Sequence, residues 1–461
     1  MTPNAGWRRP CAWGCGARDA ARTDDDFATL RGDPDVRALL GLPAPVRPAR
    51  DEAWRADLRF LAERVEHKAY QPFRSETGNR YVSHAVYSRE EFEAAVAKLS
   101  ADIPGLSDGA IEVALFRLTA GLGDGHTAIE GARTRDFGLT LPLGFYLFDD
   151  GLHVIAAAPA YADLVGARVI AFDGVPAADV LARVEPLVSR DNGQWVKAMA
   201  PTFLRHTPML HEIGVAKADD KLTLTLETPD GARRTAAVSA DFSEPDIWNA
   251  LPKPAAWRWL GDRSAADFQQ GNDRPYWQRW DPATRILYVQ YNKVADDKAK
   301  PLAAFAAELS ATIAALPVEK LVIDMRGNNG GDTHLNEPLL AAVAGAGKIN
   351  RTGHLYVITG RRTYSAAMNA VSYFGRFTKA IFVGEATGGK PNSPGDETIF
   401  TLPYSQIAVN VSDRYWQGGW PDDFADTRAP DIEVPVRFAD YAAGRDAAME
   451  VIKAQAAPKT P

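Results

Sequence analysis

Cysteine is almost missing from this chain of 461 residues. Its two cysteines, Cys11 and Cys15, lie close together near the start, and residues 16–461 contain none. Disulfide bonds therefore do not hold the fold together, which excludes a small scaffold stapled by such bonds. Residues 1–26 also lack the apolar stretch that a secretory signal needs, so we expect an unstructured or trimmed tail there.

Long apolar runs and an excess of positive charge are also absent. No stretch of about 18 consecutive apolar residues, the length that a membrane-spanning helix needs, occurs in the chain. The 52 basic and 59 acidic side chains give a formal net charge of −7, which argues against a protein built to neutralise phosphates. We therefore expect neither a transmembrane segment nor a nucleic-acid partner.

What is present is the composition of a folded globular protein, 46% hydrophobic and 24% charged, in distinct regions. Helical periodicity marks an N-terminal region at 27–137, and short β-type runs separated by turns fill 138–240. Residues 241–284 are rich in Pro, Asp and Trp, which indicates an ordered, packed connector. Strands then alternate with helices over 285–453, before a tail at 454–461. This rhythm predicts an α/β fold with buried parallel strands.

One glycine-rich stretch has the spacing of a phosphate-binding loop. It runs from Gly384 to Pro391, follows an apolar strand and includes Lys390. Pro391, however, stands where such a loop needs a Ser or Thr hydroxyl for magnesium, and the candidate partner aspartate, Asp324, comes earlier in the chain. We therefore do not expect nucleotide hydrolysis.

A second glycine cluster, MRGNNGGD at 325–332, directly follows a predicted strand. In one interpretation it is a strand-to-helix turn, in which glycine supplies the positive φ. In the other, Gly330 and Gly331 let backbone N–H groups face a developing oxyanion at close range, because no Cβ is in the way. The pattern alone leaves both interpretations open.

Ser365 stands where a predicted strand and a short basic loop lead into a helix. A serine in such a turn is usually an N-cap. The position also suits a nucleophile, because the hydroxyl would project from the carboxyl edge of the sheet. The N–H of Ala366 and the helix dipole would favour negative charge there.

These segments, together with GLGDGHTAI at His126 and VGEATGGK at Lys390, resemble the C-terminal processing peptidases and tricorn-type serine peptidases, or tail-specific proteases. The resemblance covers roughly residues 100–435. It implies a ClpP/crotonase-like core of ββα units at 285–453 and a PDZ-like domain at 138–240. It also implies a bacterial-type serine endopeptidase that acts on peptide or protein substrates without a cofactor.

Carried over position by position, the resemblance makes Ser365 the nucleophile. The oxyanion hole would consist of the backbone N–H groups of Gly330, Gly331 and Ala366. The resemblance further implies a periplasmic or secreted protein, although no signal peptide is readable in the chain.

The general base has two candidates. In the processing-peptidase branch a lysine follows the serine by 25 positions, as Lys390 follows Ser365. In the tricorn-like branch a histidine from the N-terminal part is the base, and His126 matches it. A lysine with a pKa of about 10.4 must lose roughly 3.4 units, or about 4.6 kcal/mol, to be half neutral at pH 7, whereas a histidine near 6.5 needs no shift. We therefore favour His126 slightly over Lys390.

The chain departs from the tricorn-like pattern at two positions. Gly125 precedes His126 where that branch has a serine, and Phe424 stands where it has a glutamate. Acidic residues near the catalytic motifs are the candidates for the supporting acid: Glu385, Asp423 and Asp426.

Other chemistries have less support in the sequence. His206 and His211 lie five positions apart beside Glu212, but no third and fourth ligand has a recognisable spacing, so we expect no metal site. Two alternatives to a peptidase stay open. One is a peptide-binding protein that keeps the scaffold without turnover, and the other is a hydrolase of non-peptide esters or amides.

Overall fold

The computed structural model describes Val36, Leu40 and residues 49–74, 85–130, 138–243, 256–262, 264 and 266–455. The chain divides into two compact units, residues 1–54 and 55–461, and the candidate site lies wholly in the second. The expected tail at 1–26 lies outside the described residues. None of the helices within the described ranges has both the length and the apolar character that a bilayer span requires.

Helices occupy the region where the sequence shows helical periodicity. α4 begins at a capping box, in which the Ser88 hydroxyl accepts from the backbone N–H of Glu91 and the Glu91 carboxylate accepts from that of Ser88. Ser107 caps the next helix through the N–H of Ala110. The helices are α3 (Arg50–Lys68), α4 (Arg89–Asp102) and α5 (Asp108–Ala120), with a 3-10 turn η3 (Ile103–Gly105).

The middle of the chain forms an antiparallel sheet of seven strands, with the order β10-β4-β5-β7-β8; β3 also pairs with β4 and β6 with β5. Helices connect β6 to β7. The strands are β3 (Leu143–Phe148), β4 (Gly151–Ala157), β5 (Arg168–Phe172), β6 (Val175–Pro176), β7 (Lys221–Glu227), β8 (Arg233–Ser239) and β10 (Arg258–Trp259); the helices are α6 (Ala177–Val184), α7 (Gly193–Phe203) and α8 (Thr207–Glu212), with 3-10 turns η5 (Pro159–Leu164) and η6 (Glu185–Leu187). A separate pair joins β2 (Leu139–Thr140) to β9 (Phe242–Ser243).

The last third of the second unit is built on a six-stranded sheet, in which β12 to β15 and β18 run parallel and β11 is an antiparallel edge. This confirms the predicted α/β fold with parallel strands. The connector at 241–284 contributes β10 to the middle sheet and β11 to this one. The strands are β11 (Tyr276–Asp281), β12 (Ile286–Tyr291), β13 (Lys320–Asp324), β14 (Leu355–Thr359), β15 (Ile381–Gly384) and β18 (Ile432–Glu433).

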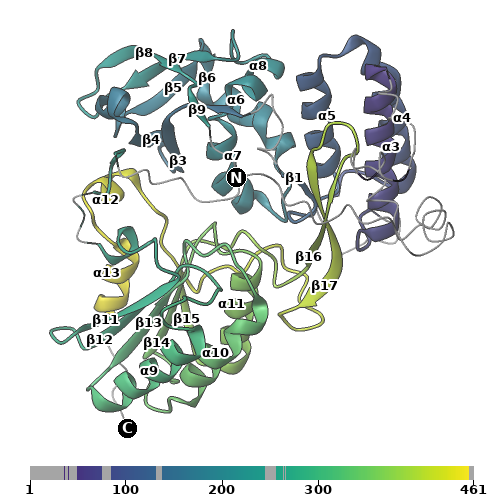
Figure 1. Ribbon diagram of the computed structural model, residues 1–461. Helices are drawn as coiled ribbons and strands as arrows, with labels where there is room; N and C mark the ends of the chain where they lie inside the picture. Colours follow the sequence, from purple (N-terminus) through teal and green to yellow (C-terminus); the bar gives the residue numbers. More distant parts are fainter. Residues whose placement is uncertain are drawn as a thin grey trace, which may run out of the picture. The chain divides into compact units, whose positions relative to one another are not determined.

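Helices cover both faces of this sheet because its strands are apolar on both sides. Alternate residues such as Leu287 and Val289 pack with α9, α10 and α11, and their neighbours Ile286 and Tyr288 pack with α13. Figure 1 shows α9, α10 and α11 on one side of β12–β15 and α13, in yellow, on the other. The helices are α9 (Leu302–Ala315), α10 (Asn336–Gly345), α11 (Ala366–Phe377), α12 (Phe438–Ala442) and α13 (Ala447–Ala454), with 3-10 turns η7 (Asp267–Gln269) and η8 (Thr333–Leu335).

A long hairpin forms a third sheet. Its strands, β16 (Asn392–Thr401) and β17 (Ala408–Gln417), pair with each other, and β17 also pairs with β1 (Ala128–Glu130). The short strand β1 begins two residues after His126. The hairpin therefore ties the segment that carries His126 to the C-terminal part of the chain.

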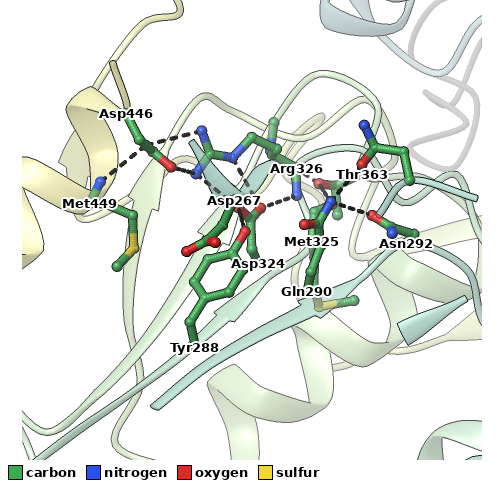
Figure 2. A network of polar contacts seen from close by, with 12 residues as sticks. Asp267, Tyr288, Gln290, Asn292, Asp324, Met325, Arg326, Thr363, Asp446 and Met449 are labelled. Carbon is green, nitrogen blue, oxygen red and sulfur yellow. Dashed lines mark hydrogen bonds and ion pairs between the residues drawn. The ribbon is translucent and has the colours of Figure 1, made fainter. Parts of the chain in front are cut away.

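A buried ionic network links the end of β13 to α13. The Arg326 guanidinium donates to Asp324 at 3.0 Å and to both carboxylate oxygens of Asp446, the N-cap of α13, at 3.2 and 2.9 Å. The Tyr288 hydroxyl donates to Asp324 at 2.7 Å. Figure 2 shows these groups around the guanidinium. These contacts hold Arg326 in place. Because Arg326 lies just after β13, they fix the start of the loop that carries the glycine cluster.

Candidate active site

Two loops that carry candidate residues leave the same edge of the core sheet. β13 and β14 are parallel neighbours, with Asp324 opposite Ile358, so their carboxyl ends lie side by side. The glycine cluster follows β13, and the segment with Ser365 follows β14. Parallel pairing therefore brings together two motifs that are about forty positions apart in sequence.

Ser365 has a backbone conformation that side chains other than glycine rarely adopt. Its φ is 51° and its ψ is −130°, directly before the first residue of α11. Such a conformation costs on the order of 1–3 kcal/mol and persists only where the surroundings impose it. The hydroxyl makes no capping bond to α11, so the ordinary N-cap interpretation fails. The side chain is instead held out of the helix at the strand-to-helix turn.

The glycine cluster meets Ser365 at close range. Gly330 and Gly331 have φ values of 111° and 137°, which favour glycine. A Cβ on Gly330 would lie 3.1 Å from the Ser365 hydroxyl oxygen and 3.0 Å from the Ala366 nitrogen. A Cβ on Gly331 would collide with the carbonyl oxygen of Val294. Only glycine therefore fits at either position.

Asn328 fixes the shape of this loop. It is fully buried, and its side chain donates to the carbonyl of Tyr291 at 2.9 Å and accepts from the N–H of Gly330 at 2.9 Å. The Gly330 N–H is therefore already engaged within the loop. In contrast, the N–H groups of Gly331 and Ala366 have no acceptor among the described residues. These two donors are the ones left for an anion beside Ser365.

His126 lies in the same site, although it is 239 positions before Ser365. Its Nδ1 is 2.9 Å from the hydroxyl of Tyr364, and the two rings stack with centroids 4.6 Å apart. On the other side of Tyr364, the ring of Trp195 stacks at 4.0 Å. Burial raises the pKa of the Tyr364 hydroxyl well above its usual value, so this group stays neutral. The imidazole is thus held in place by the residue that precedes Ser365.

Two adjoining cavities, of about 370 and 290 Å³, open onto Ser365. Both are lined by His126, Gly331, Ser365 and Glu397, and we call them together the serine cavity. The structure therefore brings His126, Ser365 and the glycine cluster to one cavity, as the sequence predicts for a hydrolytic site.

The structure does not bring Lys390 to this cavity. Its side chain is buried, with its ammonium 3.8 Å from the carboxylate of Asp426. Nor do the three candidate acids line the cavity. Glu385 is paired with Arg361 at 2.5 Å, Asp423 accepts from the N–H of Ala425 at 3.1 Å, and Asp426 faces Lys390. Their carboxylates are occupied elsewhere in the chain.

Glu397 is a carboxylate that the sequence motifs do not single out. It lies on β16, and its Oε1 is 4.0 Å from Nε2 of His126. The side chain is about one-third exposed, at 36%. Nothing in the local sequence marks it, because the pairing of β1 with β17 and of β17 with β16 determines its place.

Two buried aspartates flank His126. Asp124 accepts from the N–H of His126 and from the Thr127 hydroxyl, and Asp191 accepts from the N–H of Gly125. Burial raises the pKa of Asp191, against the attraction of nearby cations. Ligand atoms of Asp124, His126 and Asp191 lie within 4.8 Å of one another. Through these hydrogen bonds the two aspartates hold the backbone at Gly125 and His126.

Comparison with known proteins gives matches at the level of structure. No family model and no curated protein sequence matches the chain. The structure of mature CPAF complexed with lactacystin is 14% identical in sequence, has a TM-score of 0.62, and covers 87% of this chain and 98% of that one. The chain shares this fold. A second structure of mature CPAF, also 14% identical, has a TM-score of 0.58 over 87% of this chain and 96% of that one.

The likeness to the two CPAF structures, at 14% identity, shows a shared fold. A photosystem II D1 C-terminal processing protease also matches, with 14% identity and a TM-score of 0.40 over 88% of this chain and 98% of that one. At that score it adds no argument of its own.

Proposed function

We propose that this protein is a serine peptidase that cleaves peptide bonds through an acyl-enzyme. The observation that carries the proposal is the set of groups around the Ser365 hydroxyl. This hydroxyl makes no capping bond at a strained turn, and it shares one cavity with His126. Beside it are the N–H groups of Gly331 and Ala366, for which the described residues supply no acceptor. This arrangement has the parts that acyl transfer needs: a nucleophile, a base and an oxyanion site.

The mechanism follows from these positions. His126 takes the proton of the Ser365 hydroxyl as its oxygen attacks the substrate carbonyl carbon. The N–H groups of Gly331 and Ala366 stabilise the negative oxygen of the tetrahedral intermediate. The imidazolium then gives its proton to the leaving amine, and the C–N bond breaks. Water, activated by the same imidazole, releases the acid and restores the serine.

We assign two further side chains to His126. The neutral Tyr364 hydroxyl orients the ring through Nδ1, and Glu397 is the supporting acid, since its negative charge favours the imidazolium that forms during attack. In this proposal Lys390 is not the base and has a structural role beside Asp426.

The domains of the family are part of the same proposal. We assign the core at 285–453 to the ClpP/crotonase-like fold and the β region at 138–240 to a PDZ-like domain. The antiparallel sheet of the middle region and the parallel sheet of the core support these assignments.

Hydrolysis of a peptide pool tests the proposal. Wild-type protein should generate new peptide ends that mass spectrometry detects, and Ser365→Ala should generate none while keeping its melting temperature within a few degrees. Ester and amide pools, run in parallel, test the hydrolase of non-peptide bonds. An inert wild-type protein that binds peptides would establish the alternative, a binding protein without turnover.

A further inference from the structure

A third cavity, of about 550 Å³, lies at the carboxyl ends of the core strands. Asp324, Thr359 and Gly384, the last residues of β13, β14 and β15, line it, as do Phe145 of β3 and Ile155 of β4. We call it the strand-end cavity. Its volume falls in the range of about 300–1,000 Å³ that is usual for ligand pockets.

The strand-end cavity adjoins the serine cavity. Lys293 and Asn329 line both of them, and Asn329 directly precedes Gly330 of the glycine cluster. The two cavities therefore border each other, and a peptide bound across Ser365 that extends past Lys293 would reach the strand-end cavity. The cavity is placed to receive a part of the substrate a short distance from the bond that is cut.

Its lining is basic, although the whole chain has a net charge of −7. Two of the cations are neutralised within the protein: Arg326 by Asp324 and Asp446, as Figure 2 shows, and Arg361 by Glu385. The lining cations are Lys197, Arg274, Lys293, Arg326, Arg361 and Arg362, and the lining carboxylates are Asp273, Asp324 and Glu385.

Three of the other cations lack such a partner. Lys197, Arg274 and Lys293 have no carboxylate within ion-pair distance in the described part of the chain, and each is exposed. Cations left unpaired beside a wall of low polarity favour the entry of a negative group, and they do so more strongly at low ionic strength. Charge complementarity thus points to an acidic ligand.

The remaining walls are apolar and aromatic. Phe145, Ile155, Pro201, Phe268 and Val434 line the cavity, and together they offer surface to an apolar group. A ligand that fits both parts has a carboxylate beside an apolar or aromatic side chain.

We propose that the strand-end cavity selects peptide substrates in which an acidic side chain lies next to an aromatic one. The proposal rests on the peptidase function proposed above. The negative group meets Lys293 and Arg274 at the mouth of the cavity, and the ring packs against its apolar wall. The cavity thereby determines which sequences reach Ser365.

Binding to Ser365→Ala protein tests this preference without turnover. The probes are two fluorescein-labelled peptide pools, identical except that a fixed Phe is followed by Glu in one and by Gln in the other. Fluorescence anisotropy should give the Glu pool at least about fivefold tighter binding at low salt, with the difference shrinking as salt is added.

Charge-removing variants locate the preference. Lys293→Gln/Arg274→Gln, combined with Ser365→Ala, should bind both pools about equally. The control is Lys298→Gln, which removes the same charge from an exposed lysine that does not line the cavity. It should keep the preference.

Equal binding of the two pools by the Ser365→Ala protein would overturn the proposal, as would a preference that survives in the double variant or an absence of binding to either pool. The proposed peptidase function is tested by a separate outcome. If wild-type protein cleaves nothing yet prefers the Glu pool, the serine mechanism is wrong and the cavity assignment stands.

Discussion

Substitutions in the glycine cluster test the proposed oxyanion site at the scale of single atoms. A methyl group on Gly330 would lie 2.7 Å from the Cβ of Ser365, 3.1 Å from its hydroxyl oxygen and 3.0 Å from the Ala366 nitrogen, so it would crowd the proposed oxyanion site. We expect Gly330→Ala to lower kcat by about 10²- to 10³-fold, the usual effect of disabling an oxyanion site. Steady-state kinetics on a fluorogenic peptide checks this.

Gly174→Ala is the matched control for that substitution. Gly174 also has a positive φ, 90°, but a Cβ there meets nothing within 4 Å, so it carries the backbone strain without the obstruction. Its kcat should equal that of the wild type. Comparable losses in both variants would mean that strain, not the obstructed oxyanion site, causes the effect.

The two candidate bases differ in where they lie. His126 lines the serine cavity, and Lys390 does not. We expect His126→Ala to lower kcat/KM by at least about a hundredfold and Lys390→Ala to lower it far less. For both variants kcat/KM is measured from about pH 5 to about pH 10. A larger loss in Lys390→Ala than in His126→Ala would assign the role of base to Lys390.

Asp191 predicts a pH dependence of stability. Its folded-state pKa is raised by burial, although His126 and Lys390 oppose the shift and Asp124 adds to it. The folded protein therefore binds this proton more tightly than the unfolded chain does, and the free energy of unfolding falls as pH rises from about 4 through the raised pKa.

Asp191→Asn removes that contribution and keeps an oxygen for the N–H of Gly125. The melting temperature of the variant relative to the wild type should accordingly rise between about pH 4 and pH 8. A constant difference across this range, or one that falls, would contradict the assignment of the raised pKa to Asp191.

At the scale of structural elements, the hairpin β16–β17 shapes the site in a way that the local sequence does not reveal. It brings Glu397 to 4.0 Å from His126. Two unit charges at that distance interact by about 1 kcal/mol in water and about 4 kcal/mol at an effective dielectric constant of 20. Because Glu397 is partly exposed, we expect Glu397→Gln to lower kcat/KM about three- to tenfold, as measured at neutral pH.

Asp413→Asn provides the comparison on the same hairpin. Asp413 lies on β17, accepts from the Thr398 hydroxyl and does not line the serine cavity. Equal activity of Glu397→Gln and wild type, with Asp413→Asn also unchanged, would remove Glu397 from the mechanism.

Local sequence patterns predict some of these elements and not the pairing between others. Strand and helix alternation predicts β12 to β15 with their covering helices, because each buried strand and each amphipathic helix carries its own periodicity. The pairing of Ala128 with Asn410 has no such local signal, since it depends on a contact between segments far apart in the chain. Candidate acids taken from sequence proximity therefore do not include Glu397, the acid that we propose.

For the molecule as a whole, the motifs predict which segments lie close together in the fold. They do not predict which side chains of those segments line the same cavity. Ser365, Gly331 and His126 line one cavity, as the resemblance implies. The spacing of Lys390 equally fits a base, yet burial and Asp426 hold it elsewhere. Spacing along the chain carries no information on which side of a loop a side chain faces, so only the folded structure separates the two residues.

The most direct test of the account is covalent labelling of Ser365 by a fluorophosphonate, which reacts with activated serine hydroxyls. Trypsin should release residues 363–376, which also contain Ser372, and fragment masses should place the adduct on Ser365. We predict one adduct per chain in the wild type and none in Ser365→Ala. Folded wild-type protein that stays unlabelled, or that is labelled at another residue, would contradict the serine mechanism.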